Sequence, residues 1–218
     1  MKRRILTLII GALSISAYAA TLRVVPLTAN ELNAITGHYS STYGYVHVKP
    51  DKHGLFTNFN GRRISSVKKS DGHYYSTFKL IGLIPISLRM SLDKVNGLHR
   101  VSLDRHKVKK VVGQQFKPTP VPAAWTPRLG EYRATAVNGK SKIYKVKLET
   151  QQGVVLIRLN NSKYAYPLVT KGASRLVRPT IGRPRQRHME VWPEGKSLAA
   201  IVGNIRFRLE KLELHNTE

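Results

Sequence analysis

The chain has 218 residues, a formal net charge of +25 and no cysteine. The missing cysteines exclude a disulfide framework, a lipid-modified cysteine anchor and a thiol nucleophile, and they suit an oxidising compartment. A charge this high concerns partners and solubility rather than fold, and it favours polyanions as binding partners.

The first twenty residues have the organisation of a secretory signal peptide. Cations at positions 2–4 precede an apolar run at 5–15, and small residues at 17 and 19 mark a cleavage site. The apolar run is shorter than the roughly 20 residues that span a bilayer. We therefore expect a periplasmic or secreted protein with no transmembrane span after cleavage. Export argues against nucleic acid as the partner and favours envelope polymers and lipid headgroups, including peripheral contact with a membrane.

The remainder of the chain predicts an all-β protein with one short N-terminal helix. Thr28 and Glu31 have the spacing of a capping box, and Leu32 and Ile35 follow three residues apart. Beyond the helix, short apolar runs alternate with Asn-Gly, Asp-Gly and similar turn signals. We expect strands at 43–48, 55–59, 74–78, 84–92, 98–103, 143–148, 154–159, 164–169, 198–202 and 205–209.

The order of these features repeats in the two halves of the chain. Gly37-His-Tyr39 and Gly130-Glu-Tyr132 each precede a strand, a glycine turn, a second strand and an asparagine turn. We predict two related antiparallel β-meanders, forming either small lipocalin-like barrels or one composite barrel. The expected organisation is a signal peptide at 1–20, a first unit at 21–116, a Pro-rich linker at 117–127, a second unit at 128–213 and a tail at 214–218.

Aromatic and aliphatic residues near the start of each unit are expected to close one end of it. In the second unit these residues are Trp125, Leu129 and Tyr132, and in the first unit Ile35 and Tyr39 take the same role. Large side chains of this kind stabilise a small unit strongly when they are buried.

Three stretches of the sequence resemble the C-terminal β-barrel region of exported serine hydrolases. They are Trp125-Thr-Pro-Arg-Leu-Gly-Glu-Tyr132 and residues 181–185 and 203–207. These hydrolases are the class C β-lactamase and penicillin-binding-protein-like enzymes, D-aminopeptidases included. The resemblance implies lipocalin-like β-domains without the catalytic domain, and it implies a separate serine hydrolase as one partner.

The nucleophile motif of those enzymes, Ser-x-x-Lys, has two overlapping copies at Ser65 to Lys68 and at Ser66 to Lys69. Both copies lie between two turn signals, and the chain has no Tyr-x-Asn or Ser-x-Asn triplet. We therefore predict no catalytic residue and an exported, non-catalytic binding or accessory module of the cell envelope. A degenerate or minimal β-lactamase-like serine hydrolase is the alternative, and a lipocalin-like carrier of an apolar ligand is the second alternative.

Two histidine pairs have spacings that a metal site could use. They are His47 with His53, and His99 with His106. Neither pair has the cysteine or carboxylate neighbours of a complete zinc site. We predict neither a metal nor any other cofactor.

Residues 150–189 contain no acidic residue but many cations, and the run 178–187 is interrupted by prolines. Arginine forks bind phosphate and carboxylate through two parallel hydrogen bonds. We predict an anion-binding site, while protection of a strand edge by charge is the other interpretation. The predicted site comprises Arg175, Arg178, Arg183, Arg185 and Arg187. A secondary basic patch, expected in a turn, comprises Arg62, Arg63, Lys68 and Lys69.

Overall fold

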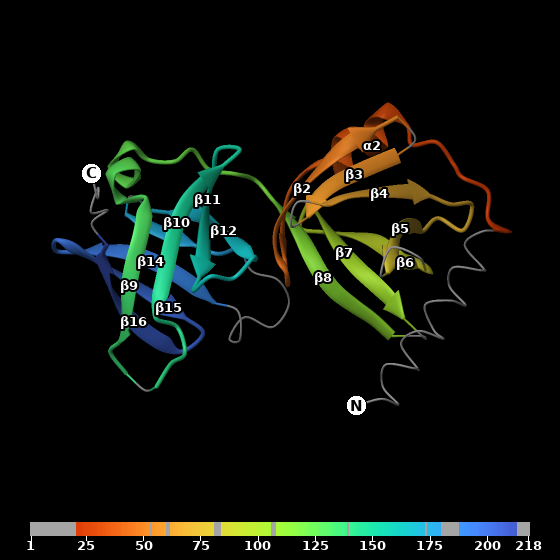
Figure 1. Ribbon diagram of the computed structural model, residues 1–218. Helices are drawn as coiled ribbons and strands as arrows, with labels where there is room; N and C mark the ends of the chain where they lie inside the picture. Colours follow the sequence, from red (N-terminus) through yellow and green to blue (C-terminus); the bar gives the residue numbers. More distant parts are fainter. Residues whose placement is uncertain are drawn as a thin grey trace, which may run out of the picture. The chain divides into compact units, whose positions relative to one another are not determined.

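The computed structural model describes residues 21–212 except 53, 60–61, 81–83, 106–107, 139, 173 and 180–187. The predicted signal peptide and the tail lie outside the described residues. The prediction of an all-β fold is confirmed, because the strands form two closed barrels of eight antiparallel strands (Figure 1). Each barrel closes on itself, so the alternative of one composite barrel is not what the chain forms.

The first barrel follows the predicted short helix and is an up-and-down meander, in which each strand pairs with the next. Its elements are α2 (Ala29–Ile35), β1 (Gly37–Ser41), β2 (Gly44–Asp51), β3 (Gly54–Phe59), β4 (Arg62–Lys68), β5 (Tyr74–Leu80), β6 (Ile84–Val95), β7 (Leu98–Arg105) and β8 (Val108–Phe116).

The second barrel has the same topology, and its first strand pairs with both the second and the last. Its elements are the 3₁₀ helix η1 (Ala123–Arg128), β9 (Gly130–Ala136), β10 (Lys145–Gln151), β11 (Val154–Leu159), β12 (Ala165–Lys171), β13 (Arg175–Val177), β14 (Met189–Glu194), β15 (Ser197–Val202) and β16 (Ile205–Lys211).

The chain divides into two compact units. Residues 21–39 and 46–115 form one unit, and residues 40–45 and 116–212 form the other. The short segment 40–45 therefore belongs to the unit of the second barrel. No helix in the described ranges combines the length and the apolar character that crossing a membrane requires.

The helix α2 begins with the predicted capping box. The backbone N–H of Glu31 donates to the Thr28 hydroxyl over 3.2 Å, and the Thr28 N–H donates to the Glu31 carboxylate over 3.0 Å. Lys68 at the end of β4 reaches the other oxygen of Glu31 at 2.5 Å. These bonds satisfy N-terminal donors of the helix and tie it to the barrel.

Each barrel has an apolar cluster among its described side chains. In the second barrel the cluster comprises fifteen described buried residues, including Trp125, Ile157 and Phe207. In the first barrel the described cluster surrounds Leu55, which pairs with the buried Ser66 of β4, and Ser66 in turn pairs with the buried Ser76 of β5.

Both barrels begin in the same way. Gly37 and Gly130 have φ angles of 126° and 131°, in the region that favours glycine. Two residues later, the Tyr39 hydroxyl donates to the carbonyl of Ile35 at 2.6 Å, and the Tyr132 hydroxyl donates to the carbonyl of Arg128 at 2.5 Å.

In each barrel, a side chain of the last strand also bonds to the leading helix. Gln115 donates to the carbonyl of Ala34 at 3.0 Å, and Lys211 donates to the carbonyl of Pro127 at 2.7 Å. Ala34 directly precedes Ile35, and Pro127 directly precedes Arg128. Each acceptor therefore lies next to the carbonyl that accepts from the tyrosine hydroxyl. The tyrosine and the last strand thus hold the leading helix against its barrel.

Candidate functional site

Two of the predicted anion-binding arginines are described, and both have partners within the chain. Arg175 on β13 forms an ion pair with Glu190 at 2.9 Å and lies 5.7 Å from the ring of Trp192. Arg178 follows β13 and is only 5% exposed. Its guanidinium stacks 4.3 Å from the ring of Tyr166 and donates to the carbonyl of Ser41, in the same compact unit, at 2.7 Å. Arg183, Arg185 and Arg187 lie outside the described residues.

The secondary basic patch does not lie in a turn, because Arg62, Arg63 and Lys68 belong to β4 and Lys69 follows it. The prediction of a turn there was wrong, since pairing with β3 and β5 extends these polar residues into a strand. Arg63 pairs with Asp51 at 2.9 Å and stacks on Phe56 at 3.8 Å.

The two lysines of this patch are also engaged. Lys68 binds Glu31, and Lys69 donates to the carbonyl of Leu22 at 3.0 Å.

The serines of the two Ser-x-x-Lys motifs are bonded to other groups. Ser66 faces the interior and shares a 2.6 Å hydrogen bond with Ser76, and Ser65 donates to Asp51 over 3.4 Å. A serine nucleophile needs an adjacent base within hydrogen-bond reach. The geometry therefore pairs neither serine with the lysine of its motif.

The described residues contain no cluster of three or more histidine, cysteine or acidic side chains placed to hold a metal ion. His47 stacks on His38 with their ring centroids 4.4 Å apart. Burial, followed by the neighbouring His47, lowers the pKa of His38. His53 and His106 lie outside the described residues. The structure therefore describes His47 of the first predicted pair and His99 of the second.

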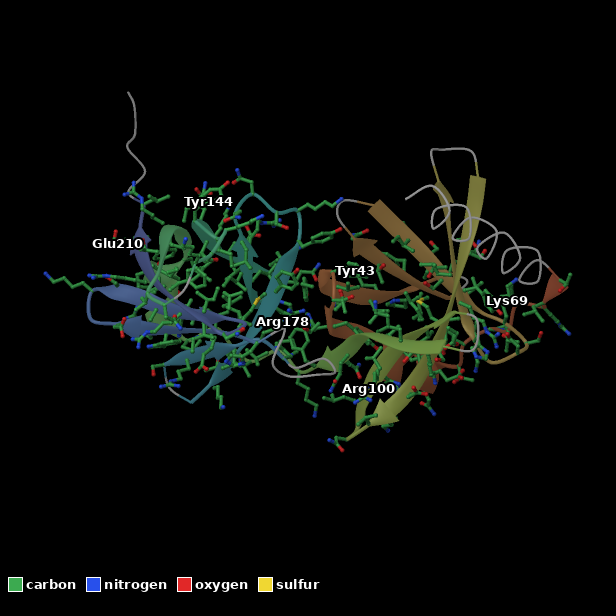
Figure 2. The ribbon with its side chains drawn as sticks, turned by 90° about the horizontal axis from the view of Figure 1, so that it is seen from below. Tyr43, Lys69, Arg100, Tyr144, Arg178 and Glu210 are labelled. Atoms are coloured by element: carbon green, nitrogen blue, oxygen red, sulfur yellow. The ribbon has the colours of Figure 1, made fainter. Side chains whose placement is uncertain are left out.

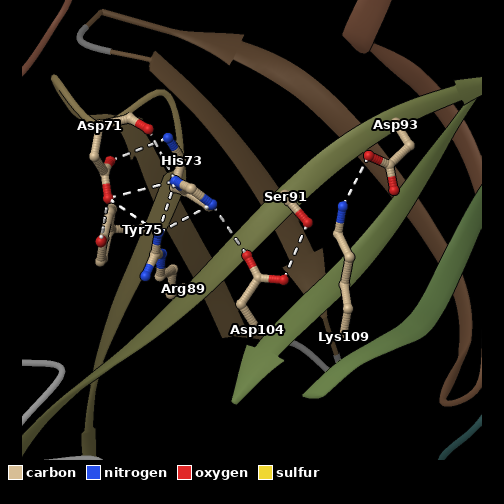
Figure 3. A network of polar contacts seen from close by, with 8 residues as sticks. All are labelled: Asp71, His73, Tyr75, Arg89, Ser91, Asp93, Asp104 and Lys109. Carbon is tan, nitrogen blue, oxygen red and sulfur yellow. Dashed lines mark hydrogen bonds and ion pairs between the residues drawn. The ribbon is translucent and has the colours of Figure 1, made fainter. Parts of the chain in front are cut away.

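A network of polar side chains covers β5 to β7 of the first barrel (Figure 3). His73 lies between two carboxylates: its Nδ1 is 3.4 Å from Asp71, and its Nε2 is 3.3 Å from Asp104. Arg89 contacts the ring of His73 at 3.1 Å, and Ser91 donates to the second oxygen of Asp104 at 3.1 Å. The serine thus binds the carboxylate rather than the histidine, so the network lacks the order of a Ser-His-Asp triad.

Asp71 makes this network sensitive to acid. Burial by itself would raise the pKa of Asp71, but the bonds from the Tyr75 hydroxyl (2.8 Å) and the His73 backbone N–H (3.1 Å), with the nearby His73 and Arg89, outweigh burial and lower it. A carboxyl whose pKa is lower in the folded state stabilises the fold above its unfolded pKa of about 3.9. That stabilisation disappears as the pH falls through the folded pKa.

We expect Asp71→Asn to make the free energy of unfolding less dependent on pH below about pH 4. The measurement is denaturant unfolding between neutral pH and pH 3, followed by circular dichroism. Tyr75→Phe removes the hydroxyl that lowers the pKa and should reproduce part of the change. An Asp71→Asn protein with the same acid dependence as the parent would contradict the role of this carboxylate.

Each acidic residue of the described ranges has a basic side chain as a neighbour. The ring of His73 lies 3.3 Å from Asp104, and a lysine or an arginine pairs with each of the others: Glu31, Asp51, Asp71, Asp93, Glu131, Glu149, Glu190, Glu194 and Glu210. Since the net charge is +25, the surplus cations must meet solvent or a partner.

Some of the exposed cations lie in the connections at one end of the second barrel. Because neighbouring strands are antiparallel, every second connection returns to the same end. At the end away from η1 the chain runs from β9 to β10, from β11 to β12, from β13 to β14 and from β15 to β16. The sequences of these connections, 137–144, 160–164, 178–188 and 203–204, contain no acidic residue, and of them 139 and 180–187 lie outside the described residues. We call these four connections the basic end. Its exposed described cations are Lys140, Lys142 and Lys163.

The predicted site included Arg175 and the arginines of 178–187 but none of the three lysines. Lys163 lies within the acid-free stretch 150–189, and residues 132–148, which contain Lys140 and Lys142, also lack acidic residues and carry several cations. Figure 2 shows Arg178 and Tyr144, two residues from different connections of the basic end, on the second barrel. No family model, curated protein or solved structure matches the chain significantly.

Proposed function

We propose that this chain is an exported, non-catalytic β-barrel module of the cell envelope that binds an anionic, phosphate-bearing component through the basic end. The observation that carries the proposal is the exposure of Lys140, Lys142 and Lys163 in connections without any acidic residue, in a unit whose described acidic side chains all have basic partners. The signal peptide predicted at 1–20 would bring the protein to the periplasm or beyond, where such components are abundant.

The described contacts support lysines, rather than the first two predicted arginines, as the binding groups. Arg175 and Arg178 already have partners, whereas Lys140, Lys142 and Lys163 are exposed in connections of the basic end. Lysine ammonium groups act as point charges on phosphate. Arg183, Arg185 and Arg187 belong to one of the four connections and complete the proposed set by sequence.

Two other functions have less support. A carrier of an apolar ligand would need space, and the interior of the second barrel is occupied by buried side chains. A serine hydrolase would need a Ser–Lys pair, and the lysines of both motifs are bonded to Glu31 and Leu22 instead. Assistance to a separate serine hydrolase rests on the sequence resemblance alone.

The test is the binding of a fluorescently labelled soluble polyphosphate, followed by anisotropy at several salt concentrations. The first variant carries Lys140→Gln, Lys142→Gln and Lys163→Gln. The matched control loses the same charge at exposed lysines outside the basic end: Lys117→Gln, Lys171→Gln and Lys196→Gln. We expect the first variant to bind about tenfold more weakly or worse and to show a smaller salt dependence, because fewer counterions are released. Equal losses of polyphosphate affinity in the two variants would show that binding depends only on the net charge of the protein, and would contradict a site at the basic end.

The arginines of the same end are tested in two further variants. One replaces Arg183, Arg185 and Arg187 with glutamine, and the other replaces them with lysine. If binding depends on the planar guanidinium fork, both variants bind weakly, whereas a charge effect leaves the lysine variant close to the parent. Binding of polyphosphate by none of the proteins at low salt would overturn the proposed function.

A further inference from the structure

The two most exposed large apolar side chains of the described residues flank one connection of the basic end. Val137 is 63% exposed and Tyr144 is 60% exposed. Lys140 and Lys142, both exposed, lie between them in the sequence. One short segment, 137–144, thus presents an aliphatic side chain, an aromatic side chain and two cations.

Hydrogen bonds hold both flanks of this connection. The side-chain oxygen of Asn160 accepts from the backbone N–H groups of Tyr144 (3.0 Å) and Lys145 (3.3 Å), while its amide donates to the carbonyl of Lys142 at 3.0 Å. On the other flank, the N–H of Val137 donates to the carbonyl of Arg206 at 2.8 Å. The backbone of Val137 and Tyr144 is therefore bonded to residues outside this connection.

Adjacent side chains of this connection differ in burial. Ile143 is partly buried and packs against the core of the barrel, while Tyr144 next to it is exposed. The ring of Tyr144 is therefore open to contact from outside the barrel.

The combination fits the surface of an anionic lipid bilayer. Tyrosine is enriched at the level of the headgroups, because its ring is apolar and its hydroxyl remains hydrated. Each lysine close to an anionic membrane strengthens binding about fivefold. A soluble acidic polymer would engage the lysines but would give Val137 and Tyr144 no apolar phase to enter.

We propose that the second barrel docks onto an anionic lipid bilayer through the connection 137–144. Val137 and Tyr144 enter the boundary between headgroups and acyl chains, and Lys140 and Lys142 contact the headgroups. This inference rests on the proposed function and names the lipid bilayer as the source of the anionic groups.

Sedimentation with vesicles tests the docking. The vesicles contain phosphatidylcholine alone, or phosphatidylcholine with roughly one third phosphatidylglycerol. We expect binding only to the anionic vesicles, and we expect the double variant Val137→Ser, Tyr144→Ser to bind them about tenfold more weakly while it binds soluble polyphosphate like the parent. Leu212→Ser, at the end of the barrel that carries η1, is the control and should bind both like the parent.

A dye at position 144 tests insertion directly. The chain has no cysteine, so Tyr144→Cys allows an environment-sensitive dye to be attached at one place, with Leu212→Cys as the control. Insertion predicts a blue shift of the dye at 144, but not at 212, when anionic vesicles are added. Vesicle binding without a shift at 144, or a double serine variant that binds vesicles like the parent, would overturn the docking while leaving the polyphosphate result intact. Failure of polyphosphate binding would instead count against the proposed function.

Discussion

Replacing Trp125 with alanine is expected to lower the free energy of unfolding of the second barrel by about 3–5 kcal/mol. Trp125 is 1% exposed and belongs to the main apolar cluster of this barrel. Trp125 lies in η1, and two side chains bond this helix to the barrel. Lys211 of the last strand donates to the carbonyl of Pro127, and Tyr132 of the first strand donates to the carbonyl of Arg128. Removal of the indole leaves a cavity that these bonds keep from collapsing. A loss of this size is a large part of the 5–15 kcal/mol that stabilises a typical domain.

Guanidinium denaturation followed by the fluorescence of Trp192 measures this effect. Trp192 is the second of the chain's two tryptophans, and it lies on β14 of the same barrel. Tyr144→Ala, which truncates an aromatic side chain that is 60% exposed, is the matched control and should leave the midpoint nearly unchanged. If Trp125→Ala unfolds at the same denaturant concentration as this control, the indole does not close the barrel.

Gly54→Ala is expected to destabilise the first barrel by about 1–3 kcal/mol. A Cβ atom at position 54 would lie 2.4 Å from the carbonyl oxygen of Ser66, which is backbone of the paired strand β4. Since this oxygen is fixed in the ladder between β3 and β4, the strands must separate locally to admit the methyl group. The cost therefore comes from overpacking and not from the backbone conformation of residue 54.

Hydrogen exchange of peptides that span β3 and β4 is the measurement, together with thermal unfolding followed by circular dichroism. Gly72→Ala is the control, because no atom lies within 4 Å of a Cβ there and only the φ angle of 79° opposes the substitution. We expect faster exchange in β3 and β4 for Gly54→Ala alone. Unchanged exchange in these strands would show that the close approach is relieved without cost.

The sequence alone predicted those parts of the fold whose signals are local. The capping box from Thr28 to Glu31 identifies the first turn of α2, because its hydrogen bonds join residues three apart. The pair Asn96-Gly97 identifies the turn between β6 and β7, where both residues have positive φ angles. The alternation of apolar and cationic residues at 205–209 predicted β16. In the structure Phe207 is buried, and Arg206 and Arg208 are exposed.

The expected strands did not include β1, β4, β8, β9, β13 and β14. Two of these six have residues that are mostly polar or very few. The strand β4 carries arginines, serines and a lysine, and β13 has three residues. Their own propensity is weak, and pairing on both sides decides their conformation. The 3₁₀ helix η1 was missed for a related reason, because its sequence reads as the end of a Pro-rich linker and burial of Trp125 holds it in place.

The sequence by itself determined the chemistry of the candidate site: a strong surplus of cations, long stretches without acidic residues, and no cysteine. Only the tertiary structure decided which cations remain available. It placed Arg175 against Glu190 and buried Arg178 over Tyr166, so two residues of the predicted site serve the fold. It also brought 137–144 and 160–164 to the end that carries 178–188, because antiparallel pairing returns every second connection of a meander to one end.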